Sequence, residues 1–300
     1  MTPDDLMFKP GLMKGQRILI TGGGTGLGKE MAEGCLILGA EVYICGRRGG
    51  VLEETAKELM DRHGGKVVPI ACDIRVPEAI HDMMDEVWSG GALTGLVNNA
   101  AGNFISRTED LSVRGFDAIS NIVFRGSFFV TLDAGKRWLA EKKKAAVVSI
   151  LTTWVWSGGP FTVPSAMSKA GLNVMTQSLA AEWGNRGVRL NAIAPGPFPT
   201  EGAWARLNPG TDASAGGGRQ ETGSPLGRVG EMRELANLAV YLLHPLSEYV
   251  NGQTIAIDGG GWNAGGGGFS SLRSWGDEEW EAARGSIRGA NEKDRAQRTV

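Results

Sequence analysis

Short apolar runs alternate with longer helical patterns from residue 16 onward, and this alternation constrains the fold more than any other feature. The runs predict strands near residues 16–20, 41–45, 67–72, 94–98, 145–151, 188–194 and 253–257. The segments between them predict helices near 27–38, 50–62, 78–88, 114–140, 165–185 and 231–243. Repeated strand–helix units are typical of a parallel sheet. The expected fold is therefore α/β: one doubly wound parallel sheet of the Rossmann type, with helices on both faces.

Two segments interrupt this alternation. Residues 201–225 are rich in Gly, Pro, Ala and Ser, which is typical of a flap beside a binding site. The repeated units and this flap predict a catalytic domain over residues 1–262. Residues 263–300 read as a Gly-rich linker and a charged tail in which Trp275 and Trp280 act as anchors. The tail is expected to pack on the same domain or on a neighbouring subunit, and the sequence favours neither.

Composition excludes several classes of function. A formal net charge of -2 provides no general attraction for nucleic acid. No apolar stretch approaches the roughly 18 residues that a membrane span needs, so no membrane partner is expected. The histidines lie far apart, so the sequence predicts no metal site. The cysteines form no CxxC pair, which indicates reduced core thiols in a cytoplasmic protein (Cys35, Cys45 and Cys72).

A glycine-rich loop directly follows the first predicted strand and opens into a helix. Glycines allow the tight turn and the close approach of the backbone to a pyrophosphate, which the N–H groups of the helix then bind. The spacing is GxxxGxG rather than the commoner GxGxxG. Its position between strand and helix nevertheless predicts a nucleotide site. The expected cofactor contacts in this loop are Thr21, Gly22, Gly24, Thr25, Gly26, Leu27 and Gly28.

The second predicted strand ends in Cys45-Gly46-Arg47-Arg48, without the acid that binds the ribose 2′-hydroxyl in NAD enzymes. No carboxylate repels a 2′-phosphate here, and a guanidinium can hold one through charge-assisted hydrogen bonds. Arg47 and Arg48 therefore favour NADP(H). The alternative is that the two arginines merely solvate a loop.

Further motifs follow the later strands, namely Asp73-Ile74, Asn98-Asn99-Ala100-Ala101-Gly102, Lys169, and Pro195-Gly196-Pro197 with Thr200. With the glycine-rich loop, they resemble the short-chain dehydrogenase/reductase family. The resemblance implies that Asp73 and Ile74 hold the adenine and that Asn99 to Gly102 shape the cofactor floor. It implies that Lys169 binds the nicotinamide ribose. Thr200 and the Pro195-Gly196-Pro197 turn would contact the pyrophosphate or carboxamide region. A homotetramer, built through the helices near 114–140 and 165–185, is also implied.

One branch of that family is matched more closely. Residues 98–106, Thr152-Thr153, residues 163–166 and residues 180–184 are similar to mitochondrial-type 2,4-dienoyl-CoA reductases, which act in fatty acid metabolism. Most of the wider family has tyrosine four residues before the lysine, whereas this branch and this chain have serine, here Ser165. The resemblance implies that hydride from NADPH adds to the far carbon of a conjugated dienoyl thioester. The protein must then donate hydrogen bonds to the thioester oxygen.

Two donors of the branch are replaced. Its tyrosine corresponds to Trp154 or Val155, and its asparagine to Arg125. Candidate substitutes are the Thr152 hydroxyl, the indole of Trp154 or Trp156, the Arg125 guanidinium and the Ser165 hydroxyl. The tryptophans could instead form an apolar wall, Arg125 could lie at a subunit contact, and Ser165 could cap a helix. The residues expected to line the substrate site are Asn103, Phe104, Trp156 and Phe198.

These residues predict an NADPH-dependent reductase of a conjugated enoyl or dienoyl thioester, with an acyl-CoA as its substrate. Alcohol dehydrogenation is disfavoured because no tyrosine lies between residues 44 and 240 to serve as a base. A reductase of another conjugated carbonyl remains an alternative. An NADP-binding protein with little catalysis is a third possibility, from a different functional class.

Overall fold

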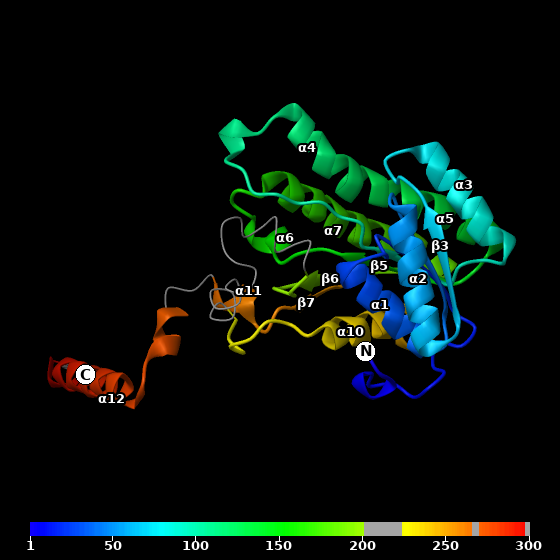
Figure 1. Ribbon diagram of the computed structural model, residues 1–300. Coiled ribbons are helices and arrows are strands. Elements are labelled where there is room, and N and C mark those ends of the chain that lie inside the picture. Colours follow the sequence, from blue (N-terminus) through cyan, green and yellow to red (C-terminus); the bar gives the residue numbers. More distant parts are fainter. Residues whose placement is uncertain (201–223, 266–269, 298–300) are drawn as a thin grey trace.

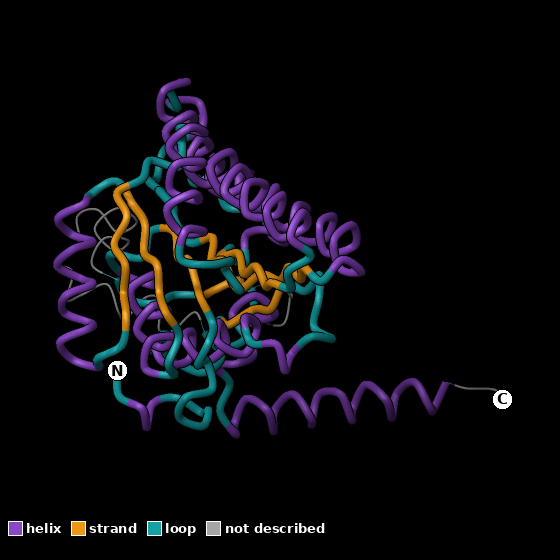
Figure 2. Tube along the Cα trace, turned by 90° about the vertical axis from the view of Figure 1, so that its right-hand side faces the viewer, coloured by secondary structure: helices purple, strands orange, loops and turns teal. Residues whose placement is uncertain are grey.

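A computed structural model describes residues 1–200, 224–265 and 270–297, and its centre is one parallel sheet (Figures 1 and 2). The strand order is β3-β2-β1-β4-β5-β6-β7, and every neighbouring pair is parallel. This confirms the predicted doubly wound sheet. The strands are β1 (Arg17–Thr21), β2 (Glu41–Gly46), β3 (Lys66–Ala71), β4 (Gly95–Asn98), β5 (Ala145–Ile150), β6 (Val188–Pro195) and β7 (Thr254–Ile257).

Helices cover both faces of this sheet (Figure 1). One face carries α1 (Gly26–Ile37), α2 (Gly49–His63) and α10 (Met232–Leu243). The other carries α3 (Pro77–Ser89), α5 (Ser127–Glu141) and α7 (Val163–Trp183). Five of them lie within a few residues of the predicted helices, and α5 corresponds to the second half of the helix predicted over 114–140. Short 3₁₀ turns connect other parts of the described chain at Pro3–Asp5, Thr108–Asp110, Gly184–Arg186, Pro245–Ser247 and Ser270–Ser274.

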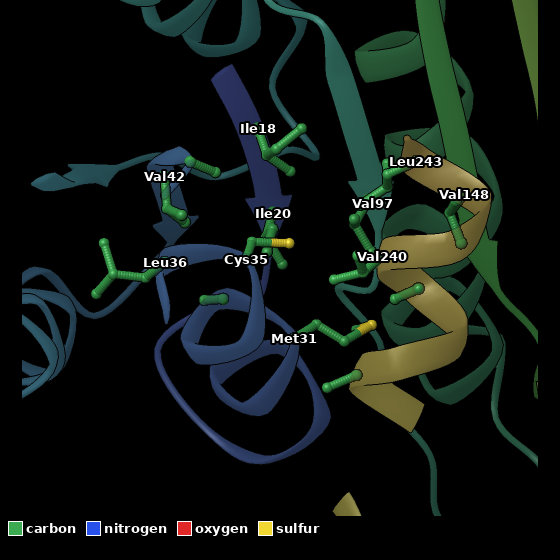
Figure 3. Close-up of a cluster of buried hydrophobic side chains, with 14 of the residues drawn as sticks. Ile18, Ile20, Met31, Cys35, Leu36, Val42, Val97, Val148, Val240 and Leu243 are labelled. Atoms are coloured by element: carbon green, nitrogen blue, oxygen red, sulfur yellow. The ribbon is translucent and has the colours of Figure 1, made fainter. Parts of the chain in front are cut away.

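The alternation of side chains along β1 explains why the sheet has two cores. Ile18 and Ile20 point to the face of α1 and α10, where they meet Met31 and Val240 (Figure 3). Leu19 points to the opposite face and joins the cluster beneath α3, α5 and α7. All of these side chains are fully buried. Successive residues of a strand face opposite ways, so a strand buried on both faces must be apolar throughout.

The long helix predicted over 114–140 is interrupted. The structure has α4 (Val113–Ser120), a π-helical segment (Asn121–Gly126) and then α5. Gly126 lies against the chain that follows β3, where an added Cβ would stand 2.9 Å from the carbonyl oxygen of Ile74. Such π-helical insertions are frequent at functional sites.

The C-terminal segment does not pack on the sheet. After α11 (Gly261–Ala264), helix α12 (Asp277–Gln297) extends away from the domain in both views (Figures 1 and 2). Trp275 and Trp280 pack edge to face against each other, with ring centroids 5.1 Å apart. Packing of the tail on its own domain stays a prediction, as does packing on a neighbouring subunit. The predicted flap falls almost entirely on residues 201–223, outside the described residues.

The cysteines lie in the core. Cys35, Cys45 and Cys72 are free and buried. Burial raises the pKa of the Cys35 thiol to about 12 and that of Cys72 to about 11. No described helix combines the length and apolar character needed to cross a bilayer.

Candidate active site

The glycine-rich loop joins β1 to α1 through two residues in the left-handed region, Gly22 at φ +66° and Gly26 at φ +55°. Glycine is also required for space. A Cβ at Gly28 would lie 2.4 Å from the Gly22 carbonyl oxygen. Thr25 is the N-cap residue of α1, and its side chain accepts no capping hydrogen bond. The first N–H groups of α1 therefore have no side-chain cap, and they can bind a pyrophosphate.

Thr21 and Asn99 tie this loop to the turn that follows β4. The Thr21 hydroxyl oxygen accepts the backbone N–H groups of Asn99 and Ala100, both at 3.0 Å. The Asn99 amide in turn donates to the carbonyl oxygens of Thr21 and Gly22, at 3.0 and 3.2 Å. A Cβ at Gly22 would lie 3.0 Å from the Cα of Ala100. The structure thus brings together two motifs that lie almost 80 residues apart in the sequence.

The turn after β6 reaches the same place. The Cβ that Gly26 lacks would lie 3.5 Å from the Thr200 methyl carbon, so Thr200 borders the start of α1. The Gly196 N–H donates to the Ile257 carbonyl at 3.0 Å, which fixes Pro195-Gly196-Pro197 beside the end of β7. Leu27 faces the α1 side of the core, where it packs as a partly buried side chain.

Phe198 was predicted to face the substrate, and the structure shows this to be wrong. Its side chain is 7% exposed and belongs to the core shared with α1 and α10. The ring packs on Gly230, where an added Cβ would stand 2.3 Å from its Cζ atom. The Gly230 N–H also donates to the Pro197 carbonyl at 2.9 Å. Phe198 therefore anchors the turn after β6 to the core.

Positive charge gathers at the ends of β2 and β3, which are neighbours in the sheet. Arg47 and Arg48 are exposed, and neither guanidinium forms a hydrogen bond or ion pair within the part of the chain that the structure describes. The Asp73 carboxylate accepts three hydrogen bonds from the Arg75 guanidinium: Nε donates to Oδ1 at 2.9 Å and to Oδ2 at 3.0 Å, and Nη2 donates to Oδ2 at 2.5 Å. These bonds, with Arg47 nearby, lower the pKa of Asp73 below its ordinary value.

Arg75 was missed by the sequence reasoning, and its only signal was its position two residues after Asp73. Its backbone carbonyl also explains where Arg125 lies. The Arg125 Nη1 donates to this carbonyl at 2.7 Å, and its guanidinium carbon is 4.9 Å from the centroid of the Phe129 ring. Ile74, 5% exposed, packs beneath Gly126. In this arrangement Arg125 therefore binds the connection after β3. None of its contacts indicates donation to a thioester oxygen.

Lys169 lies deep beside the end of β5. Its side chain is 6% exposed, and its ammonium group donates to the Ile150 carbonyl oxygen. Burial lowers the pKa of Lys169 to about 8. Thr152 lies two residues after the end of β5 and is half-buried. Its hydroxyl makes no hydrogen bond to the described residues, so it can serve a ligand.

Ser165 lies one turn before Lys169 on the same face of α7 and is 4% exposed. The N-cap residue of α7 is Thr162, and no side chain caps that end. The alternative that Ser165 caps the helix is therefore wrong. Its hydroxyl makes no hydrogen bond within the described ranges, and the side chain faces the same way as Lys169.

Both candidate tryptophans lie on a single helical turn, α6 (Trp154–Ser157). Trp154 is half-buried, and its ring covers Gly159, where an added Cβ would lie 3.1 Å from ring carbon Cγ. Trp156 is 36% exposed and packs on Trp262 of α11, with ring centroids 5.3 Å apart and planes tilted by 37°. Trp262 was missed, although it follows the glycines after the last predicted strand, where a ligand crevice is expected.

Asn103 and Phe104 shape the loop after β4. The Asn103 Oδ1 accepts the backbone N–H of Phe104 at 2.9 Å. The Phe104 ring packs on a small apolar cluster that includes Ile119 and Leu172. In the same turn, Ala101 is exposed and Gly102 lies against the Ile119 side chain. None of these four residues forms a described hydrogen bond to Lys169, Thr152 or Ser165.

The fold and this site define a Rossmann-type dinucleotide-dependent enzyme. The carboxyl ends of β1, β4 and β6 converge on the start of α1, whose first N–H groups have no side-chain cap, and the Cβ atoms absent from Gly22 and Gly28 let the loop pack closely against the turn after β4. Lys169 supplies a buried amine, and Ser165 and Thr152 supply two hydroxyls that have no partner among the described residues.

Known proteins place the chain more narrowly. A family model described as enoyl-(acyl carrier protein) reductase matches residues 22–261. A probable 2,4-dienoyl-CoA reductase [(3E)-enoyl-CoA-producing] of Caenorhabditis elegans is 42% identical over 97% of this chain and 95% of its own length. A probable 2,4-dienoyl-CoA reductase [(2E)-enoyl-CoA-producing] of Bacillus subtilis is 40% identical, over 83% of this chain and 98% of its own.

Solved structures agree. A short-chain dehydrogenase from Bacillus anthracis has a TM-score of 0.74 and 38% identity, and it covers 83% of this chain and 97% of its own. A putative NAD(P)-dependent gluconate 5-dehydrogenase from Beutenbergia cavernae, with bound NADP, has a TM-score of 0.77 at 28% identity, over 85% of this chain and 100% of its own. The chain belongs to the short-chain dehydrogenase/reductase family and is an oxidoreductase.

Proposed function

We propose that this protein is an NADPH-dependent 2,4-dienoyl-CoA reductase. The observation that carries the proposal is Ser165 one turn before the buried Lys169, in a chain 42% identical over 97% of its length to a probable 2,4-dienoyl-CoA reductase. A serine cannot replace a tyrosine as the base that an alcohol dehydrogenase needs. Hydride addition to a conjugated thioester requires no such base, which favours this reaction over alcohol oxidation.

The start of α1 fits a dinucleotide phosphate, because its first N–H groups have no side-chain cap and Gly22 and Gly26 allow the left-handed turns that lead to it. Bound NADPH supplies the hydride. Loops after β1, β4 and β6 would hold its pyrophosphate, and Lys169 would hold the nicotinamide ribose. The exposed and unpaired Arg47 and Arg48 support NADPH over NADH, since they can bind a 2′-phosphate.

The residues near Lys169 act on the thioester. As hydride adds to the far carbon of the conjugated chain, the electron pair moves toward the carbonyl and leaves a dienolate with negative charge on oxygen. The Thr152 hydroxyl donates to that oxygen, and the neighbouring ammonium group of Lys169 stabilises the charge. Water then delivers a proton to carbon. The two reductases above differ in the product that their names state, 2E or 3E, so the protonated carbon must be identified by product analysis.

We expect the purified protein to oxidise NADPH when 2,4-hexadienoyl-CoA is added. Thr152→Val removes the hydroxyl at nearly constant volume and should lower kcat by about 10²-fold, the usual effect of losing an oxyanion donor. The assay follows NADPH absorbance in stopped-flow and steady-state experiments.

The adjacent Thr153 provides a matched control, because Thr153→Val makes the same chemical change next to the site. It should stay within about twofold of the wild type, and Thr152→Ser should restore most activity. Failure of the wild-type protein to consume NADPH with any conjugated thioester would contradict the reaction. Equal rates for Thr152→Val and wild type would show that the Thr152 hydroxyl takes no part in the reaction. Turnover of a conjugated ketone but no thioester would favour the alternative substrate class.

We further propose a homotetramer formed through the α4–α5 and α7 surface. Four apolar side chains are exposed there: Phe124 (46%), Phe128 (37%), Met167 (58%) and Val174 (59%). The Phe124 ring packs on Gly171 of α7, so the two helical segments present a shared apolar surface. Contiguous exposed apolar area of this kind marks an interaction surface.

Sedimentation equilibrium tests this assembly, with a mass of four chains expected for the wild type. Val174→Glu places a charge in the apolar surface and should yield smaller species. Leu246→Glu alters a residue that is 84% exposed in the turn after α10 and should leave the mass unchanged. A monomeric wild-type protein, or equal effects of both variants, would contradict the proposal.

A further inference from the structure

The Trp156–Trp262 pair spans the end of the sheet beside the proposed reaction centre. Trp156 follows β5 and Trp262 follows β7, and these strands flank β6 in the sheet order. The contact between the two rings therefore crosses the exit of β6, from which the cofactor turn at Pro195 emerges. Ligands of open α/β sheets bind at these carboxyl ends. The pair thus lies at the end of the sheet where a ligand is expected.

These two tryptophans differ from the tryptophans that only pack the fold. Trp138 is fully buried and donates its indole N–H to the Leu93 carbonyl at 2.8 Å. The Trp88 and Trp183 indoles donate to carboxylates. Trp156 and Trp262 are instead 36% and 38% exposed, and their indole N–H groups have no partner among the described residues. A pair that leaves ring and N–H free is suited to a ligand.

The pair is also held rigidly. The backbone N–H of Trp262 donates to Asp258 Oδ2 at 2.6 Å, and the backbone N–H of Gly260 donates to Asp258 Oδ1 at 2.9 Å. On the other side, the backbone N–H groups of Val155 and Trp156 donate to the carbonyls of Thr152 and Thr153, at 3.2 and 3.1 Å. A surface fixed before binding loses less entropy when a ligand docks.

Distance along the chain identifies the part of the substrate that meets these rings. Trp156 lies four residues after Thr152, in the turn that opens with the hydrogen bond from the Val155 N–H to the Thr152 carbonyl. If Thr152 holds the thioester oxygen, the carbons next to that carbonyl lie beside the indoles. The adenine of coenzyme A lies beyond the whole pantetheine arm and is too far away. The acyl group is the part in reach.

On this basis, and resting on the proposed thioester reduction, we propose that the Trp156–Trp262 pair is a specificity wall for the acyl group. Its flat rings favour planar acyl groups, conjugated or aromatic, over saturated groups of the same size. Planar π-systems stack on indole with a gain beyond the burial of apolar area. The same contact keeps a conjugated chain flat. The substrate class is therefore short acyl-CoA thioesters that are planar next to the carbonyl.

Binding of two ring thioesters tests the wall without requiring turnover. Benzoyl-CoA and cyclohexanecarbonyl-CoA have the same number of ring carbons, and only the first is planar. Calorimetric titration of the protein saturated with NADP⁺ should give a Kd for benzoyl-CoA that is about five- to tenfold lower. Trp262→Ala should reduce this preference to within about twofold, and Trp262→Phe, which keeps a flat ring, should retain most of it.

Trp275 is the matched control, because it is 37% exposed and also packs on a second tryptophan. Trp275→Ala should keep the full preference. Equal affinity of the wild type for both rings, or equal losses in Trp262→Ala and Trp275→Ala, would overturn the proposal. A parallel loss of NADP⁺ affinity in Trp262→Ala would show a structural effect and overturn it as well.

The test also separates this proposal from the reaction. A preference for benzoyl-CoA without reduction of 2,4-hexadienoyl-CoA would leave the wall in place and refute the reductase. Reduction of 2,4-hexadienoyl-CoA without that preference would refute the wall alone.

Discussion

Lys169→Met is expected to lower kcat/KM for 2,4-hexadienoyl-CoA by about 10²- to 10³-fold, because it removes a buried positive charge from the reaction centre. The ammonium group donates to the Ile150 carbonyl at the end of β5 and has almost no contact with solvent. Methionine preserves the length of the side chain, so packing should change little. The measurement is steady-state turnover, with titration of NADPH to separate cofactor binding from the chemical step.

The control is Lys136→Met on α5, an exposed lysine of the same chain, which should behave as wild type. An unchanged kcat/KM in Lys169→Met would exclude Lys169 from both cofactor binding and catalysis. A lower affinity for NADPH together with a lower kcat would support its contact with the nicotinamide ribose.

The same lysine should make stability depend on pH. Burial lowers the pKa of Lys169 from 10.5 to about 8, so the folded chain releases this proton before the unfolded chain does. Between these two values the unfolded state binds more protons, and the free energy of unfolding rises with pH. The expected gain from pH 8 to 10.5 is on the order of 3 kcal/mol. Urea unfolding at pH 7.5 and pH 10 should show this gain in the wild type relative to Lys169→Met, and parallel changes would contradict it.

Replacing both Arg47 and Arg48 by alanine is expected to raise the Kd for NADPH by about 10²-fold or more, since each charge-assisted hydrogen bond contributes roughly 1.5–3 kcal/mol. The Kd for NADH should change by less than about threefold. Both guanidinium groups are exposed and unpaired within the described residues, and Asp73 is already neutralised by Arg75. The end of β2 therefore presents uncompensated positive charge.

Fluorescence titration with both cofactors at fixed ionic strength measures this preference. Arg114→Ala on α4 removes another exposed arginine and should leave both affinities unchanged. Equal losses for NADPH and NADH in the double variant would mean that the arginines shape the loop and do not read the 2′-phosphate. Tight binding of NADH by the wild type would contradict the preference itself.

The fold was predictable because its signals are local in the sequence. Each strand is a short apolar run, and the continuous run at 147–151 corresponds to β5, whose residues are all buried. The interruption between α4 and α5 was not predictable in this way. The apolar pattern continues through residues 121–126, and the π-helical geometry is apparent only from the three-dimensional structure.

The residues of the candidate site show the same difference between local signals in the sequence and contacts that only the three-dimensional structure reveals. The glycine loop and Asn99 were found because strand, turn and helix follow each other directly. Phe198 was misassigned because its partner, Gly230, lies 32 residues further along the chain, and nothing local shows that the ring turns inward. Trp262 was missed for a similar reason, since its role depends on a contact with Trp156, which is remote in sequence.

The uncapped start of α1 has a consequence for the lifetime of the protein. In the first turn of α1, directly after Thr25, no side chain caps the backbone N–H groups, and a dinucleotide phosphate can bind them instead. A ligand that binds only the folded chain stabilises it by about 2.7 kcal/mol at one hundred times its Kd. Degradation often proceeds through the unfolded state. A cell that runs short of this dinucleotide would therefore lose enzyme molecules as well as their turnover, and protein abundance would report the state of the cofactor pool.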